Sequence, residues 1–421
     1  MIAEGFFLSL RQNFVVMKKI NYVLYCLVAL VLMTAACSRG RSGDVKGLLQ
    51  TVPADASAVA VVDLNALPEN VDDNLPYKLP VDATEENGVD RSVAAFFIGG
   101  YNSYITGFLE DTDKFKASVE KETGEAFRAE GDVAVSGNIA VISDRFWVCV
   151  SSRNTVNPDE IKHFTTLSEK QSILSNEVVA GLEEMKHDVS GWGDIKGCMN
   201  AAGLDFATRA TSTMAVEAMF VDAVEFSWNM DFKKSELIAD LNVLNSKGGI
   251  AKFNFPAAKI DEATVAAAGS TADGVVALAV SPDMVRKLRE ETGGKGFSMI
   301  GVIAGMISCV DGTCAAAVSE SGNMTGVIAT TGRGTTDLSS MLSELGMTVS
   351  KEGNLLRFGK GEVSGGMSVS EAAAELKGSM AGAVYSGKSG KIASDKISSV
   401  VVTLNPEKGG LAAHVKVRWK E

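Results

Sequence analysis

The chain has 421 residues, of which 46% are hydrophobic and 22% charged, and its formal net charge at pH 7 is −12. This acidic balance argues against nucleic acid as a partner, because binding to nucleic acid depends on a cationic face. The length predicts two or three domains and supplies ample apolar side chains for their cores.

The N-terminus has the layout of a signal peptide. The pair Lys18-Lys19 precedes an uncharged run over 22–33, and small residues then lead to Cys37. The run is too short for a spanning helix, which needs about 20 apolar residues. We therefore predict a signal peptide over 1–36, with Met17 as a candidate start.

The four residues that end this segment, Thr34-Ala35-Ala36-Cys37, resemble the lipobox of bacterial lipoproteins, although Thr34 stands where that motif favours Leu. The resemblance implies cleavage before Cys37 and acylation of its thiol and its new amino group. Several acyl chains anchor a protein firmly, whereas one alone is marginal. Residues 37–50 would then form a lipidated tether, and the membrane would be a partner. The alternatives are an uncleaved N-terminal anchor and a Cys37 that only marks the boundary of the apolar region.

The charges that follow Cys37 bear on the side of the membrane. Lipoproteins of Bacteroidetes, to which this N-terminus is similar, carry an acidic run soon after the cysteine when they are exported to the cell surface. Here the first charges are Arg39 and Arg41, and the first acidic residue is Asp44. The resemblance therefore implies the periplasmic face of the outer membrane.

Beyond the tether, the same series of elements occurs twice. Each series opens with Ala-Asp and a short apolar run, over 58–62 in the first and 275–280 in the second. Such runs predict strands that are buried on both faces.

A helix comes next in each series. One begins at Thr112-Asp113 and ends at Gly124, and the other begins at Thr336-Asp337 and ends at Gly346. Threonine is a good N-cap and glycine is typical of a helix C-terminus.

A Gly-Asn turn follows each helix, at 137–138 and 353–354, and leads into a further strand. Ser175 and Ser370 then predict the N-caps of another pair of helices.

The closing segments 237–243 and 411–419 alternate apolar and polar residues. A partner strand precedes each of them across a polar turn, at 224–228 in the first series and at 400–404 in the second. Period two indicates strands with one buried face, so an antiparallel hairpin closes each series.

These patterns predict an α+β fold made of two tandem, divergent repeats of an antiparallel sheet with helices. The first module covers 51–255, a linker covers 256–264, and the second module covers 265–421. Inside the second module, Ser281-Pro282 predicts the start of a helix, and the apolar stretch 297–307 predicts a core helix.

The segment 382–389 matches the P-loop pattern, with Gly387, Lys388 and Ser389 as its phosphate-binding end. The pattern lacks its context, because helical sequence precedes it and few residues follow to complete a parallel sheet. We favour a glycine-rich loop between a helix and a strand, and we predict no cofactor.

The cysteines, histidines and tryptophans suggest no catalytic or metal site. Four cysteines lie in the body of the chain, and in an oxidising compartment they would pair within each half, unless they stay buried thiols. They are Cys149, Cys198, Cys309 and Cys314. The histidines lack metal-ligand spacing, so surface or structural roles are expected for His163, His187 and His414. Core roles are expected for Trp147, Trp192, Trp228 and Trp419.

The motif VPADASAVAVVDL at 52–64, placed after a lipobox and before a duplicated α+β layout, resembles a family of uncharacterised Bacteroidetes lipoproteins. The resemblance carries no catalytic residue. Because clefts between domains often hold ligands, the duplicated layout predicts an exported envelope protein that binds an envelope partner or ligand through the groove between its two modules, or acts as a scaffold, without being an enzyme. The alternative is a hydrolase with an Asp/Glu site. Two converging carboxylates with shifted pKa values in a pocket would favour the hydrolase, and a shallow apolar patch would favour the binding protein.

Overall fold

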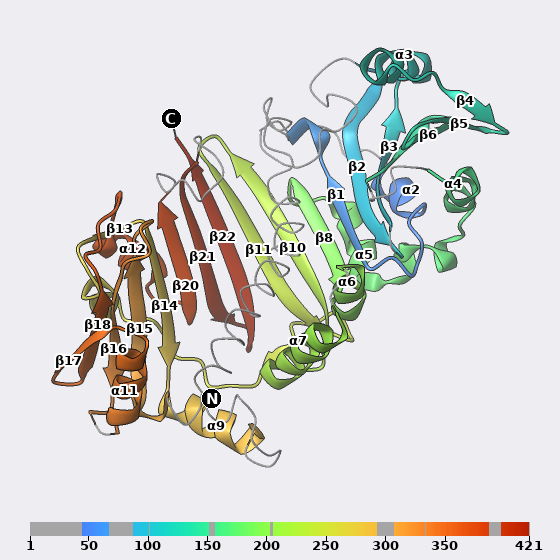
Figure 1. The fold of residues 1–421 in the computed structure, drawn as a ribbon. Coiled ribbons are helices and arrows are strands. Elements are labelled where there is room, and N and C mark those ends of the chain that lie inside the picture. The colour runs from blue at the N-terminus through green and yellow to red at the C-terminus, as the bar shows by residue number, and fades with distance from the viewer. Residues whose placement is uncertain are drawn as a thin grey trace. The chain divides into compact units, whose positions relative to one another are not determined.

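The computed structural model describes residues 44–66, 87–100, 102–150, 156–202, 205–292, 307–332, 334–386 and 397–420 (Figure 1). The chain divides into two compact units. Unit 1 contains the residues up to 215 with 224–234 and 244–249, and unit 2 contains 216–223, 235–243 and the residues from 250 onward. Each unit has its own hydrophobic core.

The strands of unit 1 pair antiparallel in the order β4-β5-β6-β7-β3-β2-β1-β8-β10. Their bounds are Ala58–Val62 for β1, Val89–Gly99 for β2, Asn102–Leu109 for β3, Arg128–Glu130 for β4, Val133–Ser136 for β5, Ile139–Ile142 for β6, Arg145–Cys149 for β7, Val189–Asp194 for β8 and Ala223–Lys233 for β10.

Helices lie on both faces of this sheet. Helices α2, α4 and α5 share a hydrophobic core with β1 and β8. Helix α3 packs with β6 and β7 in a separate hydrophobic cluster. The helices are α2 (Val45–Leu49), α3 (Thr112–Thr123), α4 (Pro158–Thr165), α5 (Glu177–Ala180) and α6 (Ile195–Ala201), with 3-10 turns η1 (Leu64–Ala66), η3 (Glu169–Gln171), η4 (Ile173–Ser175) and η5 (Gly181–Glu184). Helix α7 (Phe206–Met219) contributes residues to both units.

The main sheet of unit 2 is also antiparallel, in the order β17-β18-β16-β15-β14-β20-β21-β22-β11. The strands are β11 (Glu236–Asn245), β14 (Gly274–Val280), β15 (Val310–Val318), β16 (Met324–Thr330), β17 (Thr348–Glu352), β18 (Leu355–Lys360), β20 (Ala381–Ser386), β21 (Ile397–Glu407) and β22 (Gly410–Trp419). Two short pairs accompany it, β9 (Phe220–Val221) with β12 (Lys252–Phe253) and β13 (Thr271–Ala272) with β19 (Met367–Ser368).

In unit 2, α8 (Glu262–Ala266) and α12 (Val369–Leu376) cover one face of the central strands, and α11 (Thr336–Glu344) packs with β16 and β18. Helix α9 (Pro282–Thr292) follows β14, and the turn η6 (Ile307–Cys309) precedes β15. The predicted α+β class with antiparallel strands is confirmed.

Several local predictions are confirmed. Ser281 accepts a hydrogen bond from the backbone of Met284, and α9 begins at Pro282. Gly124 ends α3 in the left-handed conformation, with φ of 72°. Gly137, at the predicted turn before β6, also has positive φ.

The predicted N-caps are wrong by one to two residues. The carboxylate of Asp111, not Thr112, accepts the free N–H groups at the start of α3. Helix α5 begins after Asn176, whose side chain accepts two N–H groups, and α12 begins after Ser368. A carboxylate or amide oxygen accepts as well as a hydroxyl does, so several neighbouring residues compete for the cap position.

The tether prediction is wrong from residue 45 onward. Helix α2 is a short amphipathic segment, and its apolar side chains pack in the core of unit 1. These buried residues are Val45, Leu48 and Leu49. Cys37, the predicted signal peptide over 1–36 and most of the predicted core helix 297–307 lie outside the described residues. Among the helices that the structure describes, none has the length and apolar character to cross a membrane.

Candidate functional site

Strand β22 carries a row of basic side chains on one face of the unit 2 sheet. His414, Lys416 and Arg418 alternate along the strand, and Glu236 and Asp240 face this row from β11. The sequence analysis expected a surface or structural role for His414. Each basic side chain of the row is partly exposed and meets a carboxylate, so the row forms a set of ion pairs.

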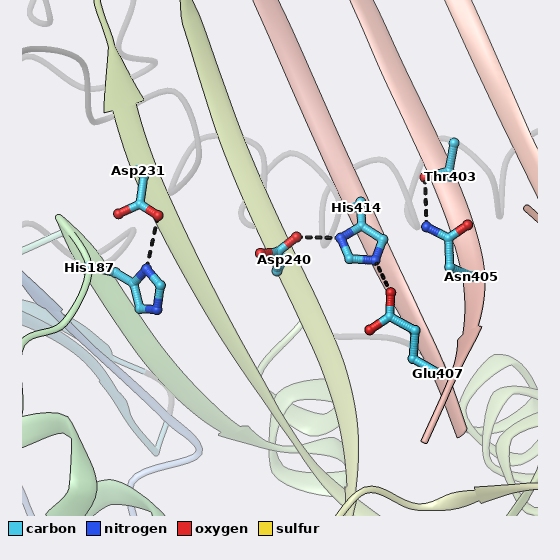
Figure 2. A network of polar contacts seen from close by, with 7 residues as sticks. All are labelled: His187, Asp231, Asp240, Thr403, Asn405, Glu407 and His414. Atoms are coloured by element: carbon cyan, nitrogen blue, oxygen red, sulfur yellow. Dashed lines mark hydrogen bonds and ion pairs between the residues drawn. The ribbon is translucent and has the colours of Figure 1, made fainter. Parts of the chain in front are cut away.

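His414 is held at both ring nitrogens. Its Nδ1 bonds to Asp240 on β11, and its Nε2 lies 2.9 Å from Glu407 Oε1 at the end of β21 (Figure 2). A carboxylate accepts but does not donate when ionised, so this arrangement requires two N–H groups and therefore the imidazolium form. Partial burial lowers the pKa of His414, but the bonds and charges of Asp240 and Glu407 outweigh it and hold the pKa above its usual value.

The neighbouring cations are tied to helix α12. Glu375 accepts a 2.6 Å hydrogen bond from Arg418 and lies 3.7 Å from Lys416 Nζ. Thr403, directly opposite His414 on β21, accepts a hydrogen bond from the Asn405 amide, as Figure 2 shows. Three separate groups of side chains therefore form polar contacts here, and together they involve three strands and helix α12.

The protonated ring is unsuited to act as a general base, a metal ligand or a nucleophile. An imidazolium with both nitrogens donating has no lone pair for a proton, a metal ion or an acyl group. Within the described ranges, no group of three or more His, Cys, Asp or Glu side chains has the geometry to hold a metal ion. The cluster is best understood as an electrostatic link between strands.

A second cluster, in unit 1, gathers acidic groups. His187 Nδ1 lies 2.9 Å from Asp231 Oδ2 (Figure 2). Asp188 accepts a 2.7 Å hydrogen bond from the backbone N–H of Phe232. Burial is the main cause that raises the pKa values of both Asp188 and Asp63, and each also feels a neighbouring carboxylate.

Hydrogen bonds to the backbone account for the positions of Asp63 and Asp188. Asp63 accepts a 2.9 Å hydrogen bond from the backbone N–H of Asn65 at the start of η1. Asp188 binds the backbone of β10 in the same way. Acceptors at strand ends and turns are common, so the shifted pKa values alone do not identify a catalytic pair.

The unit 2 sheet also exposes apolar side chains. Val276 and Leu278 on β14 are 42% and 39% exposed, and Tyr385 on β20 is 37% exposed. Because directly paired residues point to the same face, the register of β14 with β20 places all three on the face opposite α12. We call these three residues the apolar row.

The apolar row corrects one prediction and continues across the sheet. The run 275–280 was expected to be buried on both faces, and only its α12 face is fully buried. On the exposed face, Ala383 of β20 and Val402 of β21 extend the row, and both are partly exposed. An apolar run in sequence cannot distinguish a face that the fold covers from one that it leaves open.

The predicted glycine-rich loop is wrong in its described part. Residues 382–386 form strand β20, which is paired with β14 on one side and with β21 on the other. A P-loop would need these residues to curve around a phosphate with their N–H groups free. The pattern's last residues, Gly387, Lys388 and Ser389, lie outside the described residues.

All four predicted disulfide cysteines are thiols in this structure. Cys149 lies in β7, Cys309 in η6 and Cys314 in β15. The Cys198 thiol, on α6, donates to the carbonyl of Ser57. Pairing within each half remains a prediction for the oxidised protein.

The core role predicted for tryptophan is confirmed for three residues, Trp147, Trp192 and Trp228, which are at most 5% exposed. Trp419 is only partly buried. Sequence analysis missed Asp240 and Glu407 as partners of His414. The alternation of polar and apolar residues in β11 places Asp240 on the polar face of that strand. The pairing of β11 with β22 joins residues 174 positions apart (414 − 240), and no local sequence pattern indicates it.

No family model matches the chain, and no curated protein matches it. Two solved structures are similar, crystal forms I and III of TP0453. Form I has 8% identity and a TM-score of 0.31, with 80% of this chain and 97% of that chain covered. Form III has 10% identity and a TM-score of 0.32, with 78% and 96% covered. Likeness at this level carries no argument about function.

Proposed function

We propose that the protein is an exported envelope lipoprotein, anchored through lipid on Cys37 at the periplasmic face of the outer membrane, that binds a partner or ligand without catalysis. The N-terminal layout and the lipobox-like Thr34-Ala35-Ala36-Cys37 support the anchor. The described residues begin at Asp44 and enter the unit 1 core at Val45, so few residues separate the proposed lipid from the folded chain.

The apolar row is the observation that carries the binding function. Val276, Leu278 and Tyr385 expose hydrocarbon on adjacent strands of one sheet face. Exposed apolar patches on soluble domains commonly mark sites of interaction. The partner that fits is one with a hydrocarbon surface, because no charged residue occurs in β14 or β20 to recognise a polar group.

A test of the binding function compares substitutions inside and outside the row. Leu278→Gln should weaken binding of a fluorescent fatty-acid analogue about tenfold, since a buried Leu contributes roughly 1.5–3 kcal/mol. Phe206→Gln is the matched control, because Phe206 is 80% exposed on α7 and lies outside the row. Equal binding by the wild-type chain and both variants would contradict the proposal.

The anchor is tested separately. Metabolic labelling with an alkynyl fatty acid should mark the wild-type protein and a Cys26→Ser variant, but not a Cys37→Ser variant. Cys26 is the matched control because it lies inside the predicted signal peptide. Protease treatment of intact cells should leave the protein uncut if it faces the periplasm. An unlabelled protein that fractionates with cytosolic enzymes would refute the anchor.

We also propose that the chain contains two tandem, divergent repeats. The order of neighbouring strands supports this, because β7-β3-β2-β1-β8 in unit 1 corresponds to β18-β16-β15-β14-β20 in unit 2. In chain order, helix α3 follows the first three strands of one series and helix α11 follows the first three strands of the other. The last two strands of each series also correspond, since a single offset of 174 residues aligns Phe226 with Val400 and Leu237 with Leu411 (400 − 226 = 411 − 237). An experimental structure in which the two series do not superpose would refute the duplication.

The hydrolase alternative rests on Asp63 and Asp188, whose pKa values burial raises. Double replacement by Asn preserves most of their hydrogen-bonding capacity and removes both carboxyl groups. If any hydrolytic activity of the protein on envelope glycans or peptides vanished in this variant while its fold persisted, the alternative would replace the binding function.

A further inference from the structure

The link at His414 joins strands that are far apart in the sequence. Asp240 precedes His414 by 174 residues, and Glu407 precedes it by seven. Asp240 lies directly opposite His414 in the pairing of β11 with β22, and Glu407 closes the hairpin of β21 with β22. One imidazole ring therefore connects three strands.

The chemistry of the ring makes this link depend on one proton. An imidazolium donates through both nitrogens, whereas a neutral imidazole donates through one and presents a lone pair at the other. With a carboxylate at each nitrogen, the neutral ring must lose one hydrogen bond and turn a lone pair toward an anion. We propose that His414 is a protonation-dependent clasp that holds β11 and the end of β21 to β22.

The charged groups around the ring favour the protonated clasp. Asp240 from β11 and Glu407 from β21 are the groups that contact it. On β22 itself, Lys416 and Arg418 oppose protonation, but Glu375 of α12 pairs with both of them.

The remaining charges lie further along the strands. Glu236 of β11 lies opposite Arg418, and β12 contributes Lys252, which is exposed. Thr403 and Asn405 on β21 are uncharged. The two carboxylates in contact with the ring therefore dominate its electrostatic environment.

The sign of the pH dependence follows from the position of the pKa. The ring's pKa in the folded chain is raised above its usual value of about 6.5. The clasp therefore stabilises the strand junction fully below the unfolded-state pKa, and this contribution is lost as pH rises through the folded-state pKa. His414, Asp240 and Glu407 are all about a third or more exposed, so the effect is modest.

The test uses the full chain, which has only three histidines. NMR of ¹³C-labelled imidazole groups over pH 5–9 follows the His414 titration, which a His414→Gln variant assigns by the loss of its signal. We expect His414 to titrate above the ordinary histidine value of about 6.5. Titration of His414 at or below that value would overturn the clasp. His163, an exposed histidine on α4, supplies the control variant.

Hydrogen exchange then measures the junction itself. Peptides from β11 should exchange roughly two- to fivefold faster, after correction for intrinsic rates, when pH rises through the His414 titration. The His414→Gln variant should lose this pH dependence, and the His163→Gln variant should keep it. An unchanged pH dependence in His414→Gln would overturn the proposal.

A second variant guards against a failure of His414→Gln to fold. Glu407→Gln removes one of the two carboxylates at the surface end of the hairpin, where its side chain is 48% exposed. The His414 titration should move to lower pH in this variant, because one of the two carboxylates that raise its pKa is gone. If it does not move, Glu407 is not part of a clasp and the proposal fails.

Discussion

The indole of Trp228 on β10 lies against the backbone of Gly191 on β8, its direct partner in the strand pairing. A Cβ atom on Gly191 would fall inside van der Waals contact of the indole ring. Phe226 stacks on the same tryptophan, with ring centroids 5.5 Å apart. The glycine therefore makes room for a buried aromatic ring on a face of the unit 1 sheet.

We predict that Gly191→Ala destabilises the protein by about 1–3 kcal/mol, because the new methyl group must displace a packed ring. Urea unfolding followed by tryptophan fluorescence measures the change. Gly181→Ala is the matched control. Gly181 has φ of −64°, and a Cβ atom added there would meet open space, so alanine should stabilise by about 0.4–1 kcal/mol. Equal effects of the two substitutions would contradict the packing argument.

Helix α3 offers a test of which residue caps it. Asp111 accepts hydrogen bonds from the backbone N–H groups of Asp113 and Lys114, whereas the Thr112 hydroxyl donates to the Ser143 carbonyl at 3.3 Å. Asp111→Ala should therefore cost about 1 kcal/mol of unfolding free energy, and Thr112→Ala should cost clearly less. The reverse order would restore Thr112 as the cap.

Local signals predicted much of the fold. The Ser281-Pro282 start of α9 and the Gly124 end of α3 depend on residues within one turn of each other, and both are found. The class followed from the alternation that β22 shows in its sequence. Each of these features is encoded by neighbouring residues, so the sequence alone was sufficient.

The candidate sites depend on pairing between distant segments. Asp240 meets His414 only because β11 aligns with β22 in one particular register. The exposure of Leu278 depends on which face of β14 the helix α12 covers. No pattern within a window of ten or twenty residues records either choice. The sequence analysis therefore missed Asp240 as the partner of His414 and assigned Leu278 to the core.

The thiols of Cys198 and Cys314 provide a chemical test of burial. Burial is the main cause that raises the pKa of each to about 12. The thiolate is the reactive form, and at pH 8 only about 1 in 10⁴ such thiols would be ionised. Iodoacetamide should therefore alkylate both more than about 100-fold more slowly in the folded, reduced protein than in urea. Mass spectrometry of tryptic peptides gives the two rates, and similar rates would show that these cysteines are accessible.

The same peptides test the disulfide prediction. If Cys149 pairs with Cys198 and Cys309 with Cys314 in the envelope, protein isolated without reductant will resist alkylation in urea until a reductant is added. The linked peptides then identify the partners. Full alkylation in urea without reductant would instead establish that none of the four cysteines forms a disulfide.

Thr106 on β3 and Trp147 on β7 lie opposite each other in the unit 1 core, and both are 0% exposed. Neither the Thr106 hydroxyl nor the Trp147 indole N–H has a hydrogen-bond partner among the described residues. A buried polar group without a partner destabilises the folded state by about 1–3 kcal/mol.

Thr106→Val should therefore raise the free energy of unfolding by about 1 kcal/mol, because valine has nearly the same shape and no hydroxyl to desolvate. Thr330→Val is the control with the opposite expected sign. The Thr330 hydroxyl is also buried, but it donates to the Asn354 carbonyl at 3.0 Å and accepts from the Gly332 N–H. The Asn354 carbonyl would keep its hydrogen bond from the Thr330 backbone N–H, but the Gly332 N–H would lose its bond to the hydroxyl, so this substitution should destabilise. If Thr106→Val also destabilised, a bound water molecule bridging Thr106 and Trp147 would be the simplest explanation, and a crystal structure would reveal it.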